Sequence, residues 1–166
     1  MSCTYLICED LQRVASGIKE RIVNELNVPQ ENVSCFYFAD EALTFLEKNT
    51  PDFIIIDLAM DPTGLSKEER EATDGCRLTG WIVLKNYIIE GEFKDQLINT
   101  KCYIFSGYGK VLSSELGILE DQDRYNEKEI NKKLKDFRQN LFFISKRGSD
   151  GGLSDLINAI KKQTKK

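Results

Sequence analysis

Five short apolar runs are spaced along the chain in the manner of buried strands. The central run, residues 53–56, reads Phe-Ile-Ile-Ile and shows no alternation of polar and apolar positions. Such continuous apolar strands are typical of parallel sheets, because helices cover both faces of the sheet. The predicted strands are residues 5–8, 33–38, 53–56, 102–105 and 141–144.

Amphipathic helical segments separate these runs. In the first segment, apolar residues recur every four positions from Val14 to Leu26, and Asn27 and Pro29 end the pattern. Repeated alternation of strands and helices predicts right-handed βαβ units, and hence one parallel sheet between two layers of helices. Further helices are predicted over residues 42–46, from about residue 80 to 88, and over residues 153–160.

Two connections are longer than this fold requires. Residues 58–79 follow the third predicted strand, where a strand-to-helix loop usually takes about 2–6 residues. Residues 107–145 form a single crossover, and a crossover needs only about 10–12 residues or more. We therefore expect insertions at about 61–79 and 111–140 within a single domain that spans residues 1–166.

Both long connections carry helix signals, which favours structured insertions over disordered ones. Ser66 with Glu69 fits a capping box, and Asn126 with Glu129 is a weaker variant of the same motif. Apolar stripes in the second connection are formed by Leu112, Leu116 and Leu119, and by Ile130, Leu134 and Phe137.

The composition is that of a folded globular domain, with 41% apolar and 30% charged residues and a net charge of −4. Domains that bind nucleic acid usually carry a basic stripe. Here only the carboxyl-terminal tail is basic, and lysines at a helix end have a simpler explanation in the helix dipole. No direct nucleic-acid partner is therefore expected. The tail lysines are Lys161, Lys162, Lys165 and Lys166.

The cysteines and the amino terminus indicate the cellular compartment in which the protein is expected. The five cysteines form no Cys-x-x-Cys pair, and a mixed cysteine–histidine zinc site is excluded because the chain has no histidine. An odd cysteine count without a disulfide framework favours a reducing compartment. The chain shows no signal peptide, and no apolar run approaches the ~20 residues that cross a membrane. We expect a cytoplasmic protein with no membrane partner.

Polar residues with related chemistry follow four of the predicted strands. Glu9 and Asp10 follow the first, Asp57 the third, Ser106 the fourth and Lys146 the fifth. The carboxyl ends of parallel strands meet at one edge, which is where ligands bind in open sheets. Three carboxylates so close need a cation, because two unit charges 4 Å apart repel by about 4 kcal/mol at an effective dielectric of 20. Oxygen ligands of this kind suit Mg²⁺.

The combination indicates phosphoryl transfer. Asp57 can act as a nucleophile and form an acyl phosphate, while Mg²⁺ and Lys146 offset the charge of the phosphoryl oxygens and Ser106 donates a hydrogen bond to them. Taken singly, each residue has an ordinary explanation: Asp10 or Asp57 could cap a helix, Ser106 could begin a turn, and Lys146 could lie on the surface. Their agreement in order and position favours the functional interpretation.

This arrangement resembles the receiver domain of bacterial two-component response regulators, of the chemotaxis response-regulator type, over nearly the whole chain. The resemblance implies a flavodoxin-like, doubly wound α/β fold in three layers, with a five-stranded parallel sheet of order 2-1-3-4-5. It rests on Tyr-Leu-Ile-Cys-Glu-Asp at 5–10, Pro-Asp-Phe-Ile-Ile-Ile-Asp-Leu-Ala-Met at 51–60, Gly-Trp-Ile-Val-Leu-Lys at 80–85, Ile-Phe-Ser-Gly at 104–107 and Phe-Ile-Ser-Lys at 143–146.

The resemblance also implies a metal-ligand set. Asp57 would be the phosphoacceptor. Asp10 and Asp57 would ligate Mg²⁺ together with the backbone carbonyl of Ala59, and Glu9 would act mainly through a metal-bound water. Glu9 stands where aspartate is commoner in the family, which alters the reach of that side chain.

A switch is implied as well. Ser106 resembles the hydroxyl that moves toward the phosphoryl group, and Lys146 the lysine that pairs with it. Phe143 stands at the position of an aromatic rotamer switch, and plain core packing explains it equally well. Arg147 replaces the proline that normally follows the lysine, so the next loop is expected to differ, because a cis peptide costs a non-proline residue about 3–4 kcal/mol. The insertion at 61–79 is either a lid over the site or a surface insertion that has no role in it.

The implied function is a step in a His-Asp phosphorelay. The phosphoryl donor would be a sensor histidine kinase or a phosphotransfer protein, since this chain has no histidine of its own. The output would be altered binding of a downstream protein effector. The domain would not be an enzyme acting on other substrates, and would catalyse only its own phosphorylation and slow dephosphorylation.

Three other functions are compatible with parts of the sequence. A receiver-like adaptor that is never phosphorylated would keep the fold. The insertions and Arg147 favour it, whereas the complete set of Glu9, Asp10, Asp57, Ser106 and Lys146 argues against it. A phosphatase of the haloacid dehalogenase type needs an Asp-x-Asp pair on its first strand, which neither Glu9-Asp10 nor Asp57-Leu58-Ala59 provides. A nucleotide-binding fold is disfavoured because the glycine-rich phosphate-binding motifs are absent from the sequence.

Overall fold

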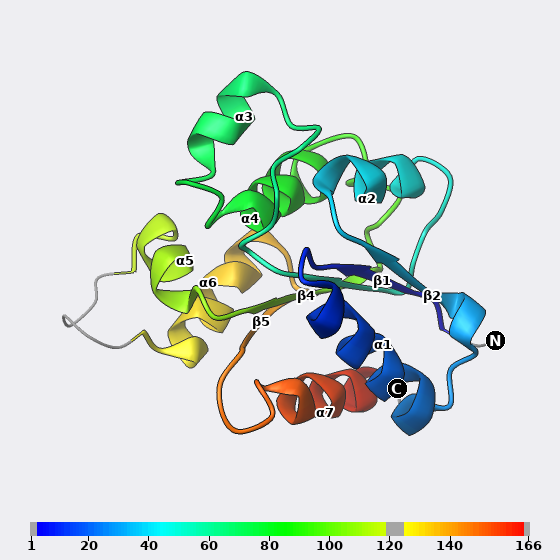
Figure 1. The fold of residues 1–166 in the computed structure, drawn as a ribbon. Helices are drawn as coiled ribbons and strands as arrows, with labels where there is room; N and C mark the ends of the chain where they lie inside the picture. Colours follow the sequence, from blue (N-terminus) through cyan, green and yellow to red (C-terminus); the bar gives the residue numbers. More distant parts are fainter. Residues whose placement is uncertain (1–2, 119–124, 165–166) are drawn as a thin grey trace.

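The computed structural model describes residues 3–118 and 125–164, which form a three-layered α/β domain (Figure 1). The five strands pair in parallel in the order β2-β1-β3-β4-β5, which confirms the predicted topology. Their bounds are β1 Tyr5–Cys8, β2 Val33–Phe36, β3 Phe53–Ile56, β4 Lys101–Ser106 and β5 Leu141–Ser145.

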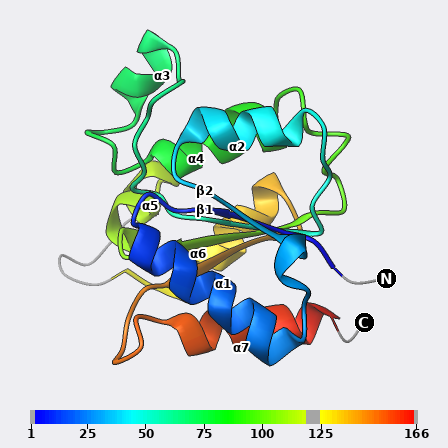
Figure 2. The ribbon, with the colours of Figure 1, turned by 45° about the vertical axis from the view of Figure 1, so that its right-hand side comes forward.

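Helices cover both faces of the sheet (Figures 1 and 2). Helices α1 (Gln12–Leu26) and α7 (Leu153–Thr164) pack together on one face. The opposite face is covered by α2 (Ala39–Leu46), by α4 (Thr79–Val83) with its continuation, the π-helix η2 (Leu84–Ile89), and by α6 (Glu127–Phe137). The remaining elements are η1 (Gln30–Asn32), α3 (Lys67–Ala72) and α5 (Gly109–Glu115).

The strand residues divide between two cores with the period of two expected of a pleated sheet. On β3, Ile54 and Ile56 face the α2–α4–α6 side, whereas Phe53 and Ile55 face the α1–α7 side. Every side chain of β3 is buried, and full burial of such a side chain is worth about 1.5–3 kcal/mol. The two cores therefore hold both helix layers against the sheet.

Several element boundaries differ from those predicted by one to four residues. Strand β2 ends at Phe36, not at residue 38, because the Tyr37 amide donates to the Glu41 side chain (3.3 Å) at the entry to α2. Strand β4 is one residue longer at each end, because Lys101 pairs with Phe53 on β3 and Ser106 pairs with Ser145 on β5. The helix expected from about residue 80 begins at Thr79 and widens to a π-helix at Leu84.

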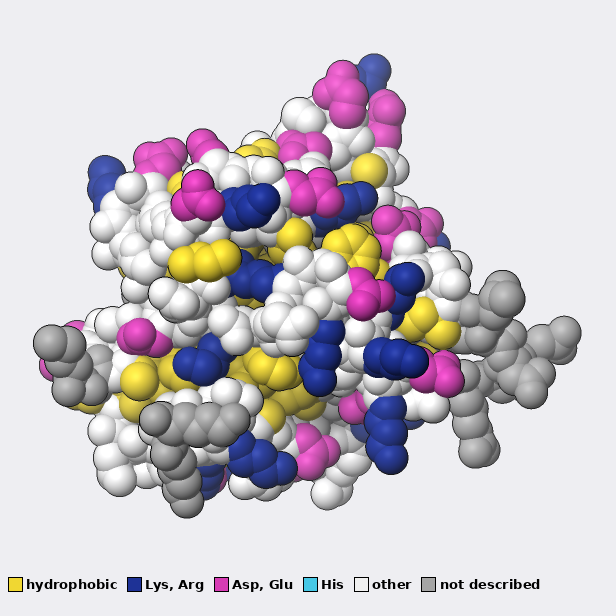
Figure 3. Space-filling model, turned by 180° about the vertical axis from the view of Figure 1, so that it is seen from behind, with side chains coloured by type: hydrophobic (Ala, Val, Ile, Leu, Met, Phe, Trp, Pro, Cys, Tyr) yellow, Lys and Arg dark blue, Asp and Glu magenta, His cyan; other side chains and the backbone are white. Residues whose placement is uncertain are grey.

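The segment between residues 61 and 79 carries α3 away from the sheet (Figures 1 and 2). The predicted capping box of Ser66 and Glu69 is confirmed at its start. Glu69 also ties α3 to η2, since its carboxylate accepts hydrogen bonds from Asn86 Nδ2 (3.0 Å) and Tyr87 Oη (3.1 Å). Leu65 is buried in the core. Seen from behind, the projecting part bears mainly acidic side chains (Figure 3).

The second long connection holds α5 and α6. Helix α6 packs along β5, with Ile130 and Leu134 fully buried, whereas Phe137 is partly exposed and meets the Trp81 ring edge-on at 5.4 Å. Asn126 caps α6 through the Lys128 N–H (3.0 Å). Of the other predicted stripe, Leu112 and Leu116 are buried and Leu119 lies outside the described residues. Across the described ranges, no helix is long and apolar enough to span a membrane.

Candidate functional site

Three charged side chains from three strand ends meet at the carboxyl edge of the sheet. Glu9 follows β1, Asp57 follows β3 and Lys146 follows β5. Lys146 Nζ donates to Glu9 Oε2 at 2.6 Å and to Asp57 Oδ2 at 2.5 Å. The long lysine side chain thus reaches from the edge strand to the centre of the sheet and links residues far apart in the sequence.

The backbone places these side chains by continuing the parallel ladder one residue past each strand. The Asp57 N–H donates to the Cys8 carbonyl (3.0 Å), and the Lys146 N–H donates to the Ser106 carbonyl (3.1 Å). Gly80, at the start of α4, lies directly against Asp57. A Cβ at position 80 would stand 1.9 Å from the Asp57 carbonyl oxygen, so only glycine permits this approach.

Burial and mutual repulsion shape the ionisation of the site. Glu9 is 1% exposed and Asp57 is 7% exposed. The pKa of Glu9 is raised, first by burial and then by the charge of Asp57, and Lys146 offsets only part of this. Burial lowers the pKa of Lys146, but the two carboxylates outweigh it and the net direction is upward.

Asp10 belongs to the same electrostatic cluster although its side chain is exposed. Burial and the nearby charge of Asp57 raise its pKa, and Asp61 adds to the effect. The edge therefore carries more carboxylate charge than Lys146 neutralises. A further cation at this edge would be favourable because it would relieve that repulsion.

The residues predicted to bind Mg²⁺ fit that ion by their chemistry. Mg²⁺ usually takes one or two carboxylates, keeps several waters and completes its shell with phosphate oxygens. Within residues 3–118 and 125–164, no group of three or more acidic, cysteine or histidine side chains is placed to hold a metal ion, and the Lys146 ammonium lies between Glu9 and Asp57. The Ala59 N–H donates to Asp57 Oδ1 at 3.4 Å, which holds the turn after β3.

The two predicted switch residues are both buried. Ser106 ends β4, and its Oγ accepts a hydrogen bond from the Tyr108 N–H at 3.3 Å. The Phe143 ring is 1% exposed and faces the α6 side of the sheet. It meets the Tyr125 ring edge-on, with centroids 5.9 Å apart. In this arrangement Phe143 packs as a core residue, and its role as a switch stays a prediction.

Two residues near the site were not foreseen from the sequence. The Asn131 amide on α6 accepts from the Phe143 N–H (2.7 Å) and donates to the Phe143 carbonyl (2.9 Å). Tyr125 shares a 2.6 Å hydrogen bond with Ser145. No local pattern marks either residue, because their roles depend on how α6 packs on β5.

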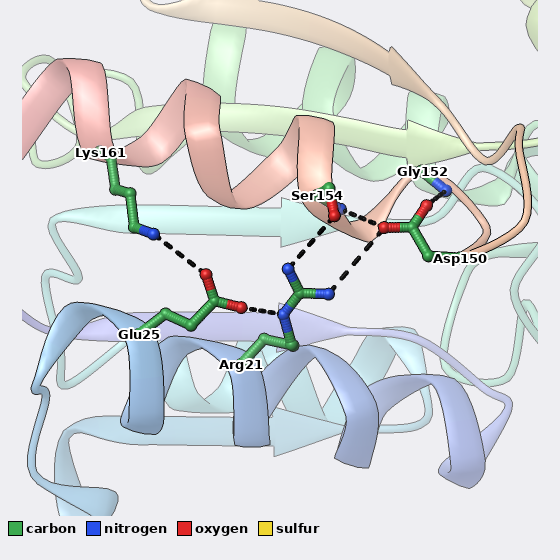
Figure 4. A network of polar contacts seen from close by, with 6 residues as sticks. All are labelled: Arg21, Glu25, Asp150, Gly152, Ser154 and Lys161. Atoms are coloured by element: carbon green, nitrogen blue, oxygen red, sulfur yellow. Dashed lines mark hydrogen bonds and ion pairs between the residues drawn. The ribbon is translucent and has the colours of Figure 1, made fainter.

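Side-chain contacts stabilise the loop after Lys146, where Arg147 stands at the position of the proline found in receiver domains. The Arg147 guanidinium lies 4.0 Å above the centre of the Tyr125 ring. Asp150 accepts hydrogen bonds from the amides of Gly152 (3.1 Å) and Ser154 (2.9 Å) at the start of α7. Arg21 on α1 reaches the same segment, and a chain of ion pairs continues through Glu25 to Lys161 (Figure 4).

Comparison with solved structures identifies the fold. The receiver domain of Francisella response regulator 1452 matches with a TM-score of 0.53 and 20% identity, over 98% of this chain and 99% of that one. The signal receiver domain of a LuxO repressor protein from Vibrio parahaemolyticus matches with a TM-score of 0.57 and 14% identity, over 99% and 92%. The phosphorylated cyanobacterial phytochrome response regulator RcpA gives 0.55 and 18%, over 98% and 93%.

These similarities show that the chain has the receiver-domain fold along nearly its whole length. No protein-family model matches the chain, and no curated protein sequence matches it. Identities of 20% and below establish the architecture alone.

Proposed function

We propose that this chain is a phosphoacceptor domain of a His-Asp phosphorelay and that Asp57 accepts the phosphoryl group. The observation that carries the proposal is the buried, net negative edge at which the Lys146 ammonium is hydrogen-bonded to Asp57. A carboxylate with a paired amine beside it, at the ligand-binding edge of a doubly wound sheet, is suited to attack phosphorus and to neutralise the product.

The step is an in-line displacement at phosphorus. A carboxylate oxygen of Asp57 forms a bond to the phosphorus of a phosphohistidine on the donor protein. The phosphorus–nitrogen bond breaks, and the imidazole leaves with the electron pair and takes up a proton. Lys146 stabilises the charge that gathers on the phosphoryl oxygens. The donor histidine belongs to another protein, since this chain contains none.

Mg²⁺ is the cofactor that this donor set favours. Asp10 and Asp57, with the backbone carbonyl of Ala59, would hold the ion, and Glu9 would act through a bound water. When bound, Mg²⁺ supplies positive charge beside the phosphoryl oxygens. The pKa values of Glu9 and Asp10 are raised first by burial and then by the charge of Asp57. The second cause supports this proposal, because a cation at the edge would offset the repulsion between the carboxylates.

Phosphorylation would act as a switch. It adds roughly 1.5 to 2 negative charges at Asp57, and the buried hydroxyl of Ser106 is the nearby donor on β4 that could turn toward them. Movement of Ser106 would shift the loop after β4 and alter the surface formed with α5 and α6. The readout would be the affinity for a downstream protein effector.

Exposed apolar side chains support docking of the donor at this edge. Leu11 follows Asp10 in the sequence and is 60% exposed, and Tyr108 and Phe38 follow the ends of β4 and β2 with 42% and 39% exposure. Exposed apolar residues that surround a polar centre are typical of protein-binding sites. We propose that the phosphohistidine-bearing protein contacts these three residues.

The test is the intact mass of the protein after incubation with Mg²⁺ and a small acyl-phosphate donor. We expect one phosphoryl adduct on the parent chain, none on Asp57→Asn, and one on Asp52→Asn. Asp52 is the matched control because it precedes β3 at the opposite edge, where it binds Thr4. A parent that gains no adduct and binds no Mg²⁺ would contradict the proposal and leave a receiver-like adaptor.

A further inference from the structure

Strand β2 forms one edge of the sheet, and its outer side lies between α1 and α2 (Figure 2). Among the described residues, no strand pairs with this side. Alternate residues of a parallel strand direct both backbone groups toward the strand with which they pair. The Phe36 carbonyl accepts from the Glu9 N–H at 3.1 Å, so Phe36 faces β1. The backbone groups of Val33, Cys35 and Tyr37 therefore point away from the sheet.

Two charged side chains cap the ends of this outer edge. Lys19 Nζ on α1 donates to the Val33 carbonyl at 2.7 Å. The Tyr37 N–H donates to Glu41 Oε2 on α2 at 3.3 Å. Cys35 lies midway between the two capped positions, and its N–H and carbonyl face outward between them. The centre of the edge therefore offers one hydrogen-bond donor and one acceptor to an incoming strand.

The two faces beside β2 leave room for such a strand. A hollow of about 410 Å³ lies beside Phe36 on the α2 side, and one of about 380 Å³ lies beside Lys19 on the α1 side. The side chains of Cys35, Phe36 and Tyr37 are each half-buried. Half-exposed aromatic residues on an open edge strand are typical of a protein-binding surface, because they add apolar area to the free backbone groups.

We propose that β2 is the interface of a two-fold symmetric dimer, in which it pairs antiparallel with β2 of a second copy around Cys35. Opposite residues of a hydrogen-bonded antiparallel pair exchange both N–H···O bonds, so Cys35 facing Cys35 satisfies both backbone groups in both copies. The same register sets Val33 opposite Tyr37 of the second copy. Lys19, beside Val33, then lies next to Glu41 of the second copy.

This self-complementarity identifies a second copy as the occupant of the edge. A two-fold interface requires one surface to match itself, and here a capped acceptor and a capped donor stand at equal distances on either side of Cys35, with caps of opposite charge. At the other edge of the sheet, Asn131 already bonds to the backbone of Phe143. Pairing is therefore confined to β2, and the assembly ends at a dimer.

The dimer goes beyond the function proposed above and does not depend on it. Because the paired strands run in opposite directions, the carboxyl edges of the two sheets face away from each other. Asp57 of each copy, which follows β3 at that edge, stays accessible to its own donor. The dimer would therefore present two independent phosphoacceptor sites at opposite ends.

Sedimentation velocity of the full chain tests the interface. The parent should form a reversible dimer with a dissociation constant of about 10–100 µM, as expected of a small interface. Lys19→Glu and Glu41→Lys each set like charges against each other, and each should raise that constant about tenfold. The combined variant restores opposite charges and should return to within about threefold of the parent.

Recovery in the combined variant would be specific to the dimer. Within one copy, Lys19 and Glu41 bind residues four positions apart on the strand, which corresponds to about 13 Å, so the two reversals do not compensate each other inside a monomer. Lys94→Glu is the matched control, since it makes the same charge change on the exposed loop after η2. It should leave the dissociation constant unchanged.

Thiol crosslinking locates the contact independently of charge. Opposite residues of a hydrogen-bonded antiparallel pair have Cα atoms about 5.5 Å apart, so a short bismaleimide should join Cys35 to Cys35 of the second copy. Cys35→Ser should abolish the crosslinked dimer. Cys76→Ser should keep it, although Cys76 is the more exposed cysteine.

Three results would each overturn the dimer. The parent could stay monomeric at concentrations up to about 1 mM, its dimer could be unaffected by both charge reversals, or it could crosslink through Cys76 instead of Cys35. Each of them leaves the role proposed for Asp57 standing, because the β2 edge takes no part in phosphoryl transfer. A parent that gains no phosphoryl adduct likewise leaves the dimer standing.

Discussion

At the scale of single residues, the balance of charge at the strand ends is the feature with the largest consequences. Two carboxylates, Glu9 and Asp57, are almost fully buried and share one ammonium. A buried charge without its partner is strongly destabilising, whereas the complete pair contributes little net stability. Lys146 is therefore needed for the stability of the resting domain as well as for the proposed chemistry.

Replacing Lys146 by methionine should lower the free energy of unfolding at neutral pH by about 3–5 kcal/mol, because two buried carboxylates lose their partner. Urea denaturation measures the change. The control is Lys101→Met, since the Lys101 ammonium lies over the Phe53 ring at 5.1 Å. It should cost no more than about 1 kcal/mol. Equal losses in the two variants would show that Lys146 has no special electrostatic role.

A pair of glycine substitutions tests the close approach of α4 to Asp57. Gly80→Ala should lower the unfolding free energy by at least about 2 kcal/mol, since its methyl group would overlap the Asp57 carbonyl. Gly17→Ala lies inside α1 with nothing within 4 Å, and it should raise the unfolding free energy by about 0.5–1 kcal/mol through helix propensity. Thermal denaturation of both variants provides the comparison, and a neutral Gly80→Ala would contradict this account of α4.

At the scale of elements, the free edge of β5 is closed by a side chain. An edge strand presents unpaired amides and carbonyls that invite pairing with another chain. Here Asn131 on α6 bonds to both the N–H and the carbonyl of Phe143, in the way that a neighbouring strand would. The same contact fixes α6 relative to β5.

Asn131→Ala should lower the unfolding free energy by about 1–3 kcal/mol, because two backbone groups at the edge lose their partner. Light scattering should also detect more self-association, since the edge of β5 becomes open. The control is Asn158→Ala on the exposed face of α7, with an expected change within about 0.5 kcal/mol. A variant as stable and as monomeric as the parent would remove Asn131 from this role.

Helix α3 depends on one carboxylate for its attachment. Glu69 accepts hydrogen bonds from Ser66, Asn86 and Tyr87. Burial acts to raise the pKa of Glu69, but these hydrogen bonds outweigh burial and the net direction is downward. A short helix of this kind has little stability of its own, so its position follows the ionisation of Glu69.

The attachment of α3 should therefore be lost in acid. The pKa of Glu69 is lower in the folded state, so its contribution is fully present above the unfolded value of about 4.3 and disappears as pH falls through the folded value. The NMR signal of the Asn86 side-chain amide should shift over that range. Glu69→Gln should abolish the shift, and the exposed control Glu71→Gln should keep it. A shift that survives in Glu69→Gln would assign the transition to another group.

At the scale of the whole molecule, the acidic edge and the folded state should be linked through Mg²⁺. An ion that binds only the folded protein raises its stability, by about 1.4 kcal/mol at ten times the dissociation constant. The melting temperature of the parent should rise with Mg²⁺, and Asp10→Asn should reduce the rise. Asp136→Asn, on the exposed side of α6, is the control and should respond as the parent does. Equal gains in all three proteins would indicate unspecific ion binding.

Most of the architecture was predictable from local sequence patterns. The five apolar runs, the stripe of α1 and the capping box of α3 each depend on neighbours within a few residues, and burial follows that periodicity directly. The strand ends also follow from it, because the polar residues that come directly after a buried run mark the edge. That is why Glu9, Asp57 and Lys146 could be assigned to one edge from their order alone.

The sequence by itself thus determined the class of fold and which polar residues follow each strand, since both depend on short-range patterns of burial. Only the tertiary structure decided which atoms meet: that Lys146 bridges Glu9 and Asp57, that Asn131 closes the edge of β5, and that Tyr125 covers the loop after Ser106. These contacts join residues from separate elements. The distances between these side chains depend on how the helices pack on the sheet, and this packing cannot be predicted from a local sequence pattern.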